Sequence, residues 1–248
     1  MRIRNIQLNA DCVLTGGNKM FFLCKWDKLP EYMKNDEVRK YYDILSKKKL
    51  ALFLKRLLDI IISCVLIIIL IIPMAVIAII VKCDSKGPVL FRQVRVTTCG
   101  KRFRIFKFRT MVEGAENLGG LITEANDKRV TKIGEKMRKY RIDEFPQVFN
   151  VLMGDMSFVG TRPEVEKYVK KYTPEMYATL LTPAGITSMA SISYKDNDEF
   201  FTDPKLVDKN YVEIILPEKM KLDLDYYTRF NAFYDLVVMF RTVGSVLH

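Results

Sequence analysis

The most prominent feature of the hydrophobic pattern is an uncharged run of roughly 22 residues, long enough to cross a bilayer as a helix. The run extends from Ile60 to Val81. Soluble proteins rarely bury a helix that is apolar all round, so the run indicates a membrane segment. Cations flank both of its ends, so the usual excess of positive charge on the cytoplasmic side fixes no orientation. These cations are Lys47, Lys48, Lys49, Lys55 and Arg56 before the run, and Lys82, Lys86, Arg92 and Arg95 after it.

Pro73 lies near the middle of this run. Proline removes a backbone donor and clashes with the preceding helical turn. Two interpretations therefore stay open: a re-entrant helix that breaks at Pro73 and returns to the same side, and a tilted spanning helix with a kink there. Asp59, at the start of the run, would be costly deep in lipid. We expect it at the interface, in an ion pair with a nearby cation such as Lys55 or Arg56.

Shorter patterns flank the apolar run. Before it, Glu31 to Lys49 has helical spacing of apolar residues. After it, Val89 to Thr110 predicts a β-hairpin, with two strand-like runs and a turn at Thr97 to Lys101. The hairpin is dense in cations between aromatic residues. Next to a membrane segment this favours binding of phosphate or lipid headgroups over binding of single-stranded nucleic acid. Lys107 and Arg109 are its candidate substrate contacts.

The C-terminal third is less regular. Val165 to Leu181 predicts an amphipathic helix, broken at Pro174, which could lie in the membrane interface or pack on the core. Pro183 to Ser188 predicts a turn that opens a polar, strand-poor loop up to Asp203. Leu222 to Val246 is apolar but carries five charged residues, so we expect a helix docked on the domain rather than a spanning one.

Composition narrows the class of partner and of metal. The formal net charge of +11 over 248 residues implies an anionic partner: nucleic acid, an anionic membrane face or a phosphorylated substrate. The five cysteines form no CxxC motif, and we expect reduced thiols in a cytosol-facing protein. The only histidine is His248, which excludes histidine-based triads and most zinc sites. Any metal should be held by oxygen atoms, which favours magnesium.

The candidate chemistry centres on Asp143 and Glu144, between a basic run that contains Arg138 and an apolar run. Pro146 predicts the first turn of a new helix, which places both carboxylates near its N-terminus, where the helix dipole stabilises the ionised form. A carboxylate can attack phosphorus or hold a hard metal ion, and nearby cations can neutralise a phosphate. Arg162, in a turn before Pro163, could bind a phosphate through two hydrogen bonds or form an ordinary salt bridge.

Several longer motifs occur in a fixed order from Lys55 onward. They are Lys55-Arg56-x-x-Asp59, FRQVR, FKFRTM, the stretch DEFPQVFNVLMGDMSFVGTRP, Tyr226-Tyr227, and Asp235 to Thr242. Over Lys55 to Val246 the chain resembles the bacterial sugar transferases known as monotopic polyprenol-phosphate phosphoglycosyl transferases. The resemblance implies an α/β (α+β) fold: a mostly helical, small catalytic domain with a short β-hairpin, a re-entrant membrane helix and interfacial amphipathic helices. It divides the chain into an extension without an assigned role (1–50), the membrane helix (51–82) and the catalytic domain (83–248).

The resemblance also implies a reaction. A UDP-sugar donates its phosphosugar to undecaprenyl phosphate or a similar polyprenol phosphate, and UMP leaves, as the first membrane step in making a surface glycan. Asp143 would be the nucleophile that forms a covalent intermediate, and Glu144 would hold Mg²⁺. The phosphate contacts would be Arg138, Arg162, Lys107 and Arg109. The expected location is the bacterial inner membrane, next to anionic lipids, with the catalytic domain on the cytoplasmic face.

Three departures from the family pattern bear on these expectations. Thr161 stands where a proline is usual, and the stretch Pro183 to Ser188 replaces a tighter turn, so both bear on the donor sugar. Ile72 before Pro73 offers no hydroxyl to a freed backbone carbonyl. Two alternatives stay open: a non-catalytic polybasic adaptor anchored at the inner leaflet, and a membrane-tethered nucleic-acid-binding module. We expect no nucleic acid as partner, and the sequence leaves monomer and homodimer both open.

Overall fold

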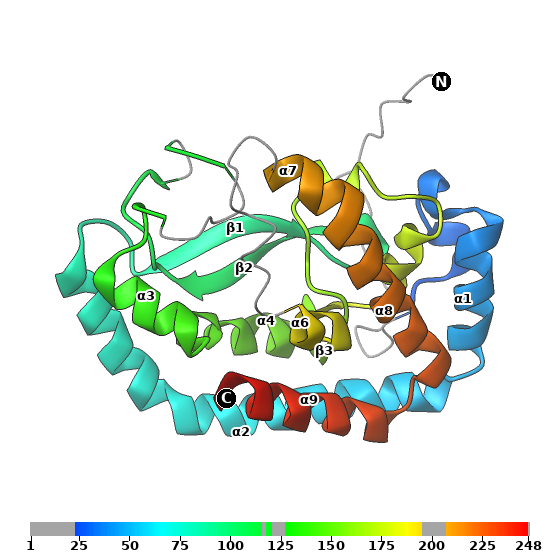
Figure 1. The fold of residues 1–248 in the computed structure, drawn as a ribbon. Helices are drawn as coiled ribbons and strands as arrows, with labels where there is room; N and C mark the ends of the chain where they lie inside the picture. The colour runs from blue at the N-terminus through cyan, green and yellow to red at the C-terminus, as the bar shows by residue number, and fades with distance from the viewer. Residues whose placement is uncertain (1–22, 116–117, 121–126, 195–206, 248) are drawn as a thin grey trace.

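The computed structural model describes residues 23–115, 118–120, 127–194 and 207–247. Helix α2 (Lys49–Asp84) runs along the base of the molecule, and α9 (Ala232–Leu247) lies beside it. Above them are α4 (Gln147–Met153), α6 (Met189–Ser193) and two small sheets. Helices α1 (Asp36–Ser46) and α8 (Leu216–Arg229) pack together on one side, and α3 (Lys132–Lys139) lies at the other end (Figure 1).

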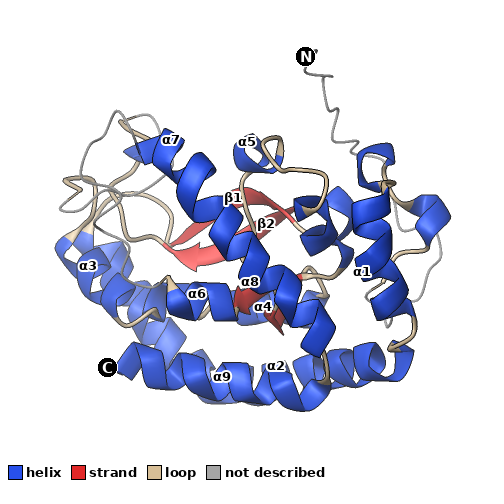
Figure 2. Cartoon of the chain, turned by 45° about the vertical axis from the view of Figure 1, so that its right-hand side comes forward, coloured by secondary structure: helices blue, strands red, loops and turns tan. Residues whose placement is uncertain are grey.

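The first sheet is the expected hairpin. Strands β1 (Leu90–Val96) and β2 (Arg102–Phe108) pair antiparallel, from Leu90 opposite Phe108 to Val96 opposite Arg102. A 3₁₀ turn, Thr98–Gly100, joins them. The chain reverses there because Cys99 and Gly100 both take positive φ angles, 56° and 73°. The sequence thus correctly predicted a mostly helical domain with a short hairpin, which Figure 2 shows among the surrounding helices.

The second sheet was not predicted. Strands β3 (Met156–Val159) and β4 (Ala184–Thr187) pair in parallel, and β4 occupies part of the segment expected to be a turn and loop. Gly160 and Gly185 make this pairing possible by their lack of side chains. A Cβ on Gly185 would lie 2.2 Å from the backbone N and O of Gly160. The close approach brings the residues after β3 next to those after β4.

The segment Val165 to Leu181 belongs to the core, and its interfacial interpretation is wrong. It forms α5 (Glu166–Val169) and a 3₁₀ helix (Met176–Leu181), and the interruption between them contains Pro174, where a break was predicted. Its apolar side chains are buried; they include Tyr168, Val169, Tyr172, Met176, Tyr177, Leu180 and Leu181. The expected helix over Leu222 to Val246 is also two elements, because α8 ends at Arg229 and α9 begins at Ala232. Ahead of α8 lie α7 (Val207–Asn210) and a π-helical turn (Tyr211–Ile215).

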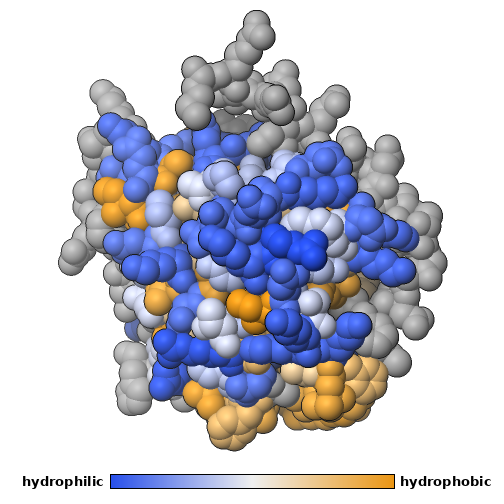
Figure 3. Space-filling model, turned by 90° about the vertical axis from the view of Figure 1, so that its right-hand side faces the viewer, coloured by the Kyte–Doolittle hydropathy of each residue, from blue (hydrophilic) through white to orange (hydrophobic). Residues whose placement is uncertain are grey.

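Helix α2 is long and apolar enough to cross a membrane. It stays helical through Pro73, and its course bends upward at one end (Figures 1 and 2). Its outer face is strongly apolar, and Ile68 and Ile72 are 76% and 73% exposed. On α9, Phe233 and Phe240 add to this surface. Figure 3 shows apolar side chains gathered at the base of the molecule below a largely hydrophilic side. We call this exposed face of α2 and α9 the apolar base.

The two halves of α2 both pack on the domain. In the first half, Lys55 Nζ donates to Val159 O (2.7 Å) and pairs with Asp235 Oδ2 (2.8 Å) on α9. Asp59 therefore does not form the expected ion pair; its Oδ1 accepts from Ser157 Oγ and Phe158 N, both at 3.1 Å. In the second half, Met74 and Val81 pack in a separate small core with Phe108 and Met137.

Residues ahead of α2 are fastened to the domain. Cys24 and Cys99 form a disulfide, which contradicts the expectation of reduced thiols for these two residues. Cys64 and Cys83 are free and exposed. Lys48, one of the cations ahead of the apolar run, donates to the carbonyls of Tyr227, Thr228 and Phe230 at the end of α8. Helix C-termini leave carbonyls without intrahelical partners, and the lysine supplies a donor and a charge.

Candidate active site

The two central carboxylates lie in a sharp turn between α3 and α4. Arg141 takes a left-handed conformation (φ 55°), a 3₁₀ turn follows at Ile142–Glu144, and Pro146 precedes the first residue of α4. Gly154 ends α4 with φ 84°. These are the helix start and stop expected from the sequence. Asp143 and Glu144 are 7% and 8% exposed, so both carboxylates are largely desolvated.

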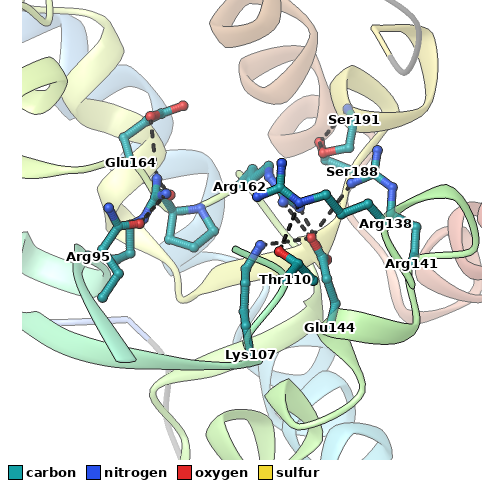
Figure 4. Close-up of polar contacts among 12 residues, drawn as sticks. Arg95, Lys107, Thr110, Arg138, Arg141, Glu144, Arg162, Glu164, Ser188 and Ser191 are labelled. Atoms are coloured by element: carbon teal, nitrogen blue, oxygen red, sulfur yellow. Dashed lines mark hydrogen bonds and ion pairs between the residues drawn. The ribbon is translucent and has the colours of Figure 1, made fainter. Parts of the chain in front are cut away.

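Glu144 is surrounded by cations from three elements (Figure 4). Its Oε1 lies 2.6 Å from Arg162 Nη2, 3.0 Å from Lys107 Nζ and 3.7 Å from Arg141 Nη1. Burial alone would raise the pKa of Glu144, but Arg162 and Lys107 hold that pKa well below its usual range. Glu144 is therefore ionised at neutral pH, and the arginine and lysine side chains are held ready around it.

Asp143 has the opposite shift. Its burial raises the pKa above the ordinary aspartate value, with the charge of Glu144 adding to the rise, while Lys107 and Arg138 oppose it. The predicted stabilisation of the ionised form by the helix dipole does not decide the pKa, because desolvation raises it. A carboxylate of raised pKa is more basic than a surface one, so its ionised form is a better nucleophile for phosphorus.

The other predicted phosphate ligands separate into two groups. Lys107 and Arg162 both contact Glu144, and Arg138 lies beside them, with its Nε donating to Thr110 Oγ1 at 2.9 Å (Figure 4). Arg109 is not in this group. Its guanidinium donates to the carbonyls of Val81, Ser85 and Pro88, where α2 ends. The structure therefore does not support a phosphate contact for Arg109, since its donors satisfy a helix C-terminus.

Hydrogen bonds from the scaffold fix both sides of the site. Asn150 on α4 joins β2, since its Oδ1 accepts from Phe106 N and its Nδ2 donates to Arg104 O, both at 2.9 Å. Lys107 is thereby held opposite Glu144. Arg56 on α2 donates to the carbonyls of Val151 and Leu152 at 2.7 and 2.9 Å, at the end of α4. Lys55 and Asp59 are bound to β3. Helix α2 therefore holds both α4, which follows Glu144, and β3, which precedes Arg162.

A cavity of about 180 Å³ opens beside this cluster. Arg141 and Arg162 line the cavity as well as contacting Glu144, so cavity and carboxylates form one continuous site. Its other polar lining residues are Arg95, Thr161, Glu164, Tyr168, Ser188, Ser191, Tyr194, Tyr211, Lys219 and Asp223. The size and the charged walls suit the polar part of a substrate with anionic groups.

Asp223 in this cavity was not predicted as a site residue. It is 4% exposed, and burial raises its pKa to about 7, although hydrogen bonds from Ser188 and Thr161 oppose the rise. Thr161 and Ser188, which lie in the two segments that depart from the family pattern, both line this cavity. The only signal in the sequence was the spacing of Lys219 and Asp223, four residues apart on one helix face.

The donor atoms of the site fit a magnesium ion held jointly with a substrate. Among the described residues there is no cluster of three or more acidic, cysteine or histidine side chains that could hold a metal. Mg²⁺ commonly uses one or two carboxylates together with substrate phosphates. Asp143 and Glu144 offer such oxygens, and a metal at Glu144 would share the carboxylate with Lys107 and Arg162.

Comparisons with known proteins bear on the whole segment from α2 onward. The family model described as bacterial sugar transferase matches residues 50–248. A UDP-N-acetylgalactosamine-undecaprenyl-phosphate N-acetylgalactosaminephosphotransferase of Aeromonas hydrophila is 34% identical over 79% of this chain and 44% of its own length. A UDP-glucose:undecaprenyl-phosphate glucose-1-phosphate transferase of Klebsiella pneumoniae is 36% identical over 76% and 39%. An enzyme of the same name from Caulobacter vibrioides is 32% identical over 78% and 69%.

The match covers less than half the length of the Aeromonas and Klebsiella relatives. The matched residues include α2, both sheets, the carboxylate turn and the cavity. From this match, which takes in every residue of the site described above, we conclude that the chain belongs to the bacterial sugar transferase family.

Proposed function

We propose that this protein transfers a sugar 1-phosphate from a UDP-sugar to a polyprenol phosphate, such as undecaprenyl phosphate, and releases UMP. The observation that carries the proposal is the pair Asp143 and Glu144, buried beside a cationic cavity and followed by α4, which packs on α2. A water-soluble diphosphate and a lipid phosphate can meet at such a place. The relatives named above are transferases of this kind, acting with UDP-sugars on undecaprenyl phosphate.

The reaction proceeds in two displacements at phosphorus. An Asp143 carboxylate oxygen attacks the phosphorus that bears the sugar. The bond between that phosphorus and the bridging oxygen of the diphosphate breaks, and UMP leaves with the electron pair. A phosphate oxygen of the polyprenol phosphate then attacks the phosphosugar on Asp143. The bond from phosphorus to Asp143 breaks, which frees the carboxylate and yields a polyprenol diphosphate sugar. No proton transfer is required in either displacement.

The surrounding cations supply the electrostatic part of this catalysis. Phosphoryl transfer depends mainly on positioning and on neutralising the charge of the phosphate oxygens. Arg162, Lys107 and Arg141 are held around Glu144 before substrate arrives, so little reorganisation is needed. Arg138 lies near enough to Asp143 to affect its charge state. These residues bind and orient the donor diphosphate against Asp143.

Mg²⁺ is the cofactor that we propose, held by Glu144 together with the donor phosphates. Bound there, it would neutralise negative charge on the diphosphate. Chelation with EDTA should abolish transfer, and added magnesium should restore it. Full activity in EDTA, after exhaustive removal of metal, would exclude this role.

The membrane arrangement that we propose is a re-entrant α2, with the domain on the cytoplasmic face of the bacterial inner membrane. Both halves of α2 pack on the same domain, through Lys55 and Asp59 in one half and Met74 and Val81 in the other. A straight spanning helix could present only one of its ends to a domain on one side. The exposed phenylalanines of α9 extend the same apolar base. Anionic lipid headgroups would then lie near the cations that flank the apolar run in the sequence.

The experiment measures UMP release from a panel of UDP-sugars, with undecaprenyl phosphate and Mg²⁺, by wild type and Asp143→Asn. Only wild type should release UMP, and the active donor identifies the sugar. Donor without acceptor should leave a phosphosugar mass on Asp143. Asp143→Asn should still bind membranes, which a non-catalytic adaptor would also do. Equal UMP release by the two proteins would exclude Asp143 as the nucleophile. No release of a nucleotide from any nucleotide sugar would favour the non-catalytic adaptor.

A further inference from the structure

Four cations from separate elements line the cavity: Arg95 on β1, Arg141 before the carboxylate turn, Arg162 after β3, and Lys219 on α8. Arg95 is engaged by Pro163 O and by Glu164. Arg141 and Arg162 have Glu144 as a counter-ion, at 3.7 and 2.6 Å. Lys219 differs from them. Across the described part of the chain, no carboxylate oxygen lies within 4.0 Å of Lys219 Nζ. The ammonium nitrogen of Lys219 lies 5.5 Å from the centre of the Tyr211 ring.

The surroundings of Lys219 disfavour an isolated charge. Burial lowers its pKa, and Arg162 and Arg141 lower it further, while Glu164 and Asp223 oppose them without a direct ion pair. A cation held near other cations in a partly buried cavity is stabilised when an anion enters. Glu164 is already engaged by Tyr211 and by Arg95, so it does not serve as a dedicated partner.

The charges of the site suit a substrate with two phosphates. Arg162 and Arg141 contact Glu144 and also line the cavity, whereas Lys219 lines the same cavity without an ion pair to Glu144. We propose that Lys219 binds the donor phosphate that leaves with the nucleoside, while Arg162 and Lys107 hold the phosphate that is transferred. The proposal rests on the proposed function and adds a residue to it.

This assignment gives Lys219 a catalytic role. When the bond between the two phosphates breaks, the bridging oxygen stays with the nucleoside monophosphate and gains negative charge. An ammonium group at that phosphate stabilises the charge as it forms and needs no proton transfer. The effect should therefore appear in turnover as well as in binding.

The test uses the full-length protein in lipid nanodiscs and three variants. Lys219→Gln removes the charge, Lys219→Arg keeps it, and Lys221→Gln is a matched control on the same helix, since Lys221 is exposed. Dissociation constants are measured for uridine, UMP and UDP, together with kcat and KM for donor and acceptor. A charge-assisted hydrogen bond contributes enough to change affinity by about 10- to 100-fold.

We expect Lys219→Gln to weaken the affinity for UMP and UDP by that factor and to lower kcat. The affinity for uridine should stay within roughly twofold of wild type. Lys219→Arg should recover most of the loss, and Lys221→Gln should match wild type.

Unchanged UMP affinity in Lys219→Gln overturns the proposal, as does an equal loss for uridine and UMP, which indicates a collapsed cavity. A rise only in the KM for polyprenol phosphate overturns it in favour of the lipid phosphate. If wild type binds no uridine nucleotide and transfers nothing, the proposed function fails first, and this proposal fails with it.

Discussion

Lys55 Nζ on α2 lies 2.8 Å from Asp235 Oδ2 on α9, and both side chains are almost fully buried. The pair joins the two helices of the apolar base. Tyr226 donates to the second oxygen of Asp235, and Lys55 also donates to Val159 O, so each charged group has a hydrogen-bond partner besides the other. Burying two charges is favourable only with such partners, and removing one charge leaves the other uncompensated.

We therefore expect Lys55→Met and Asp235→Asn each to lower the free energy of unfolding by about 3–5 kcal/mol. The double variant should lose less than the sum of the two, because neither charge is then left alone. Thermal unfolding in detergent measures these differences. Strictly additive losses would mean that the two side chains contribute independently of each other.

Asp223 predicts a specific pH dependence of stability. Its pKa is about 7 in the folded protein against an ordinary value of 3.8, so the folded state binds the proton more tightly than the unfolded state. The contribution of Asp223 to the free energy of unfolding is fully present below about pH 4. It falls by up to ~4 kcal/mol as the pH rises to about 7, and it stays at that lower level above about pH 7. Asp223→Asn removes this loss. The melting temperature of the variant relative to wild type should rise between pH 4 and pH 7.5, and a constant difference would contradict the assignment.

Gly185→Ala should damage the fold through the junction of the two parallel strands. The new Cβ would meet backbone atoms of Gly160 at 2.2 Å, and backbone cannot move aside as a flexible side chain does. We expect a loss of about 1–3 kcal/mol or more, with lower donor affinity, because Thr161 and Ser188 follow these strands. Gly244→Ala in α9 is the control, since no atom lies within 4 Å of its added Cβ. Equal stability of the two variants would show that the strands separate easily.

The Cys24–Cys99 disulfide joins the segment ahead of α2 covalently to the hairpin turn. Peptide mapping without reductant should find the two cysteines joined, while Cys64 and Cys83 react with an alkylating agent. Cys24→Ser should lower the free energy of unfolding by about 2–4 kcal/mol, and Cys64→Ser should not. Since cytosolic thiols are usually kept reduced, the mapping should be repeated on protein alkylated inside cells. Alkylation of Cys24 in protein purified under oxidising conditions would contradict the link.

Features fixed by neighbouring residues could be predicted from the sequence. The apolar run became α2, the two strand-like runs became the hairpin, and Pro146 and Gly154 bound α4. The carboxylate pair could be found for the same reason, because Asp143 and Glu144 are adjacent and followed by a recognisable helix start. Each of these signals lies within one turn, strand or helix.

Features that depend on distant residues could not. Strands β3 and β4 have only four residues each and lie far apart in the sequence, and the glycines that follow β3 and lie within β4 resemble turn residues. Arg109 sits among cations and looks like a phosphate ligand, yet its partners are the carbonyls at the end of α2. Lys219 and Asp223 looked like surface charges on a helix until the fold placed the cavity beside them.

The attachment of α2 at both of its ends has a consequence for how a lipid substrate is reached. A helix fixed by Lys55 and Arg56 at one end and by Arg109 at the other moves with the domain as one body. If the apolar base rests in the bilayer as proposed, the site keeps a fixed position relative to the membrane surface. The proposed lipid acceptor would then supply the movement, by lifting its phosphate out of the headgroup layer toward Asp143.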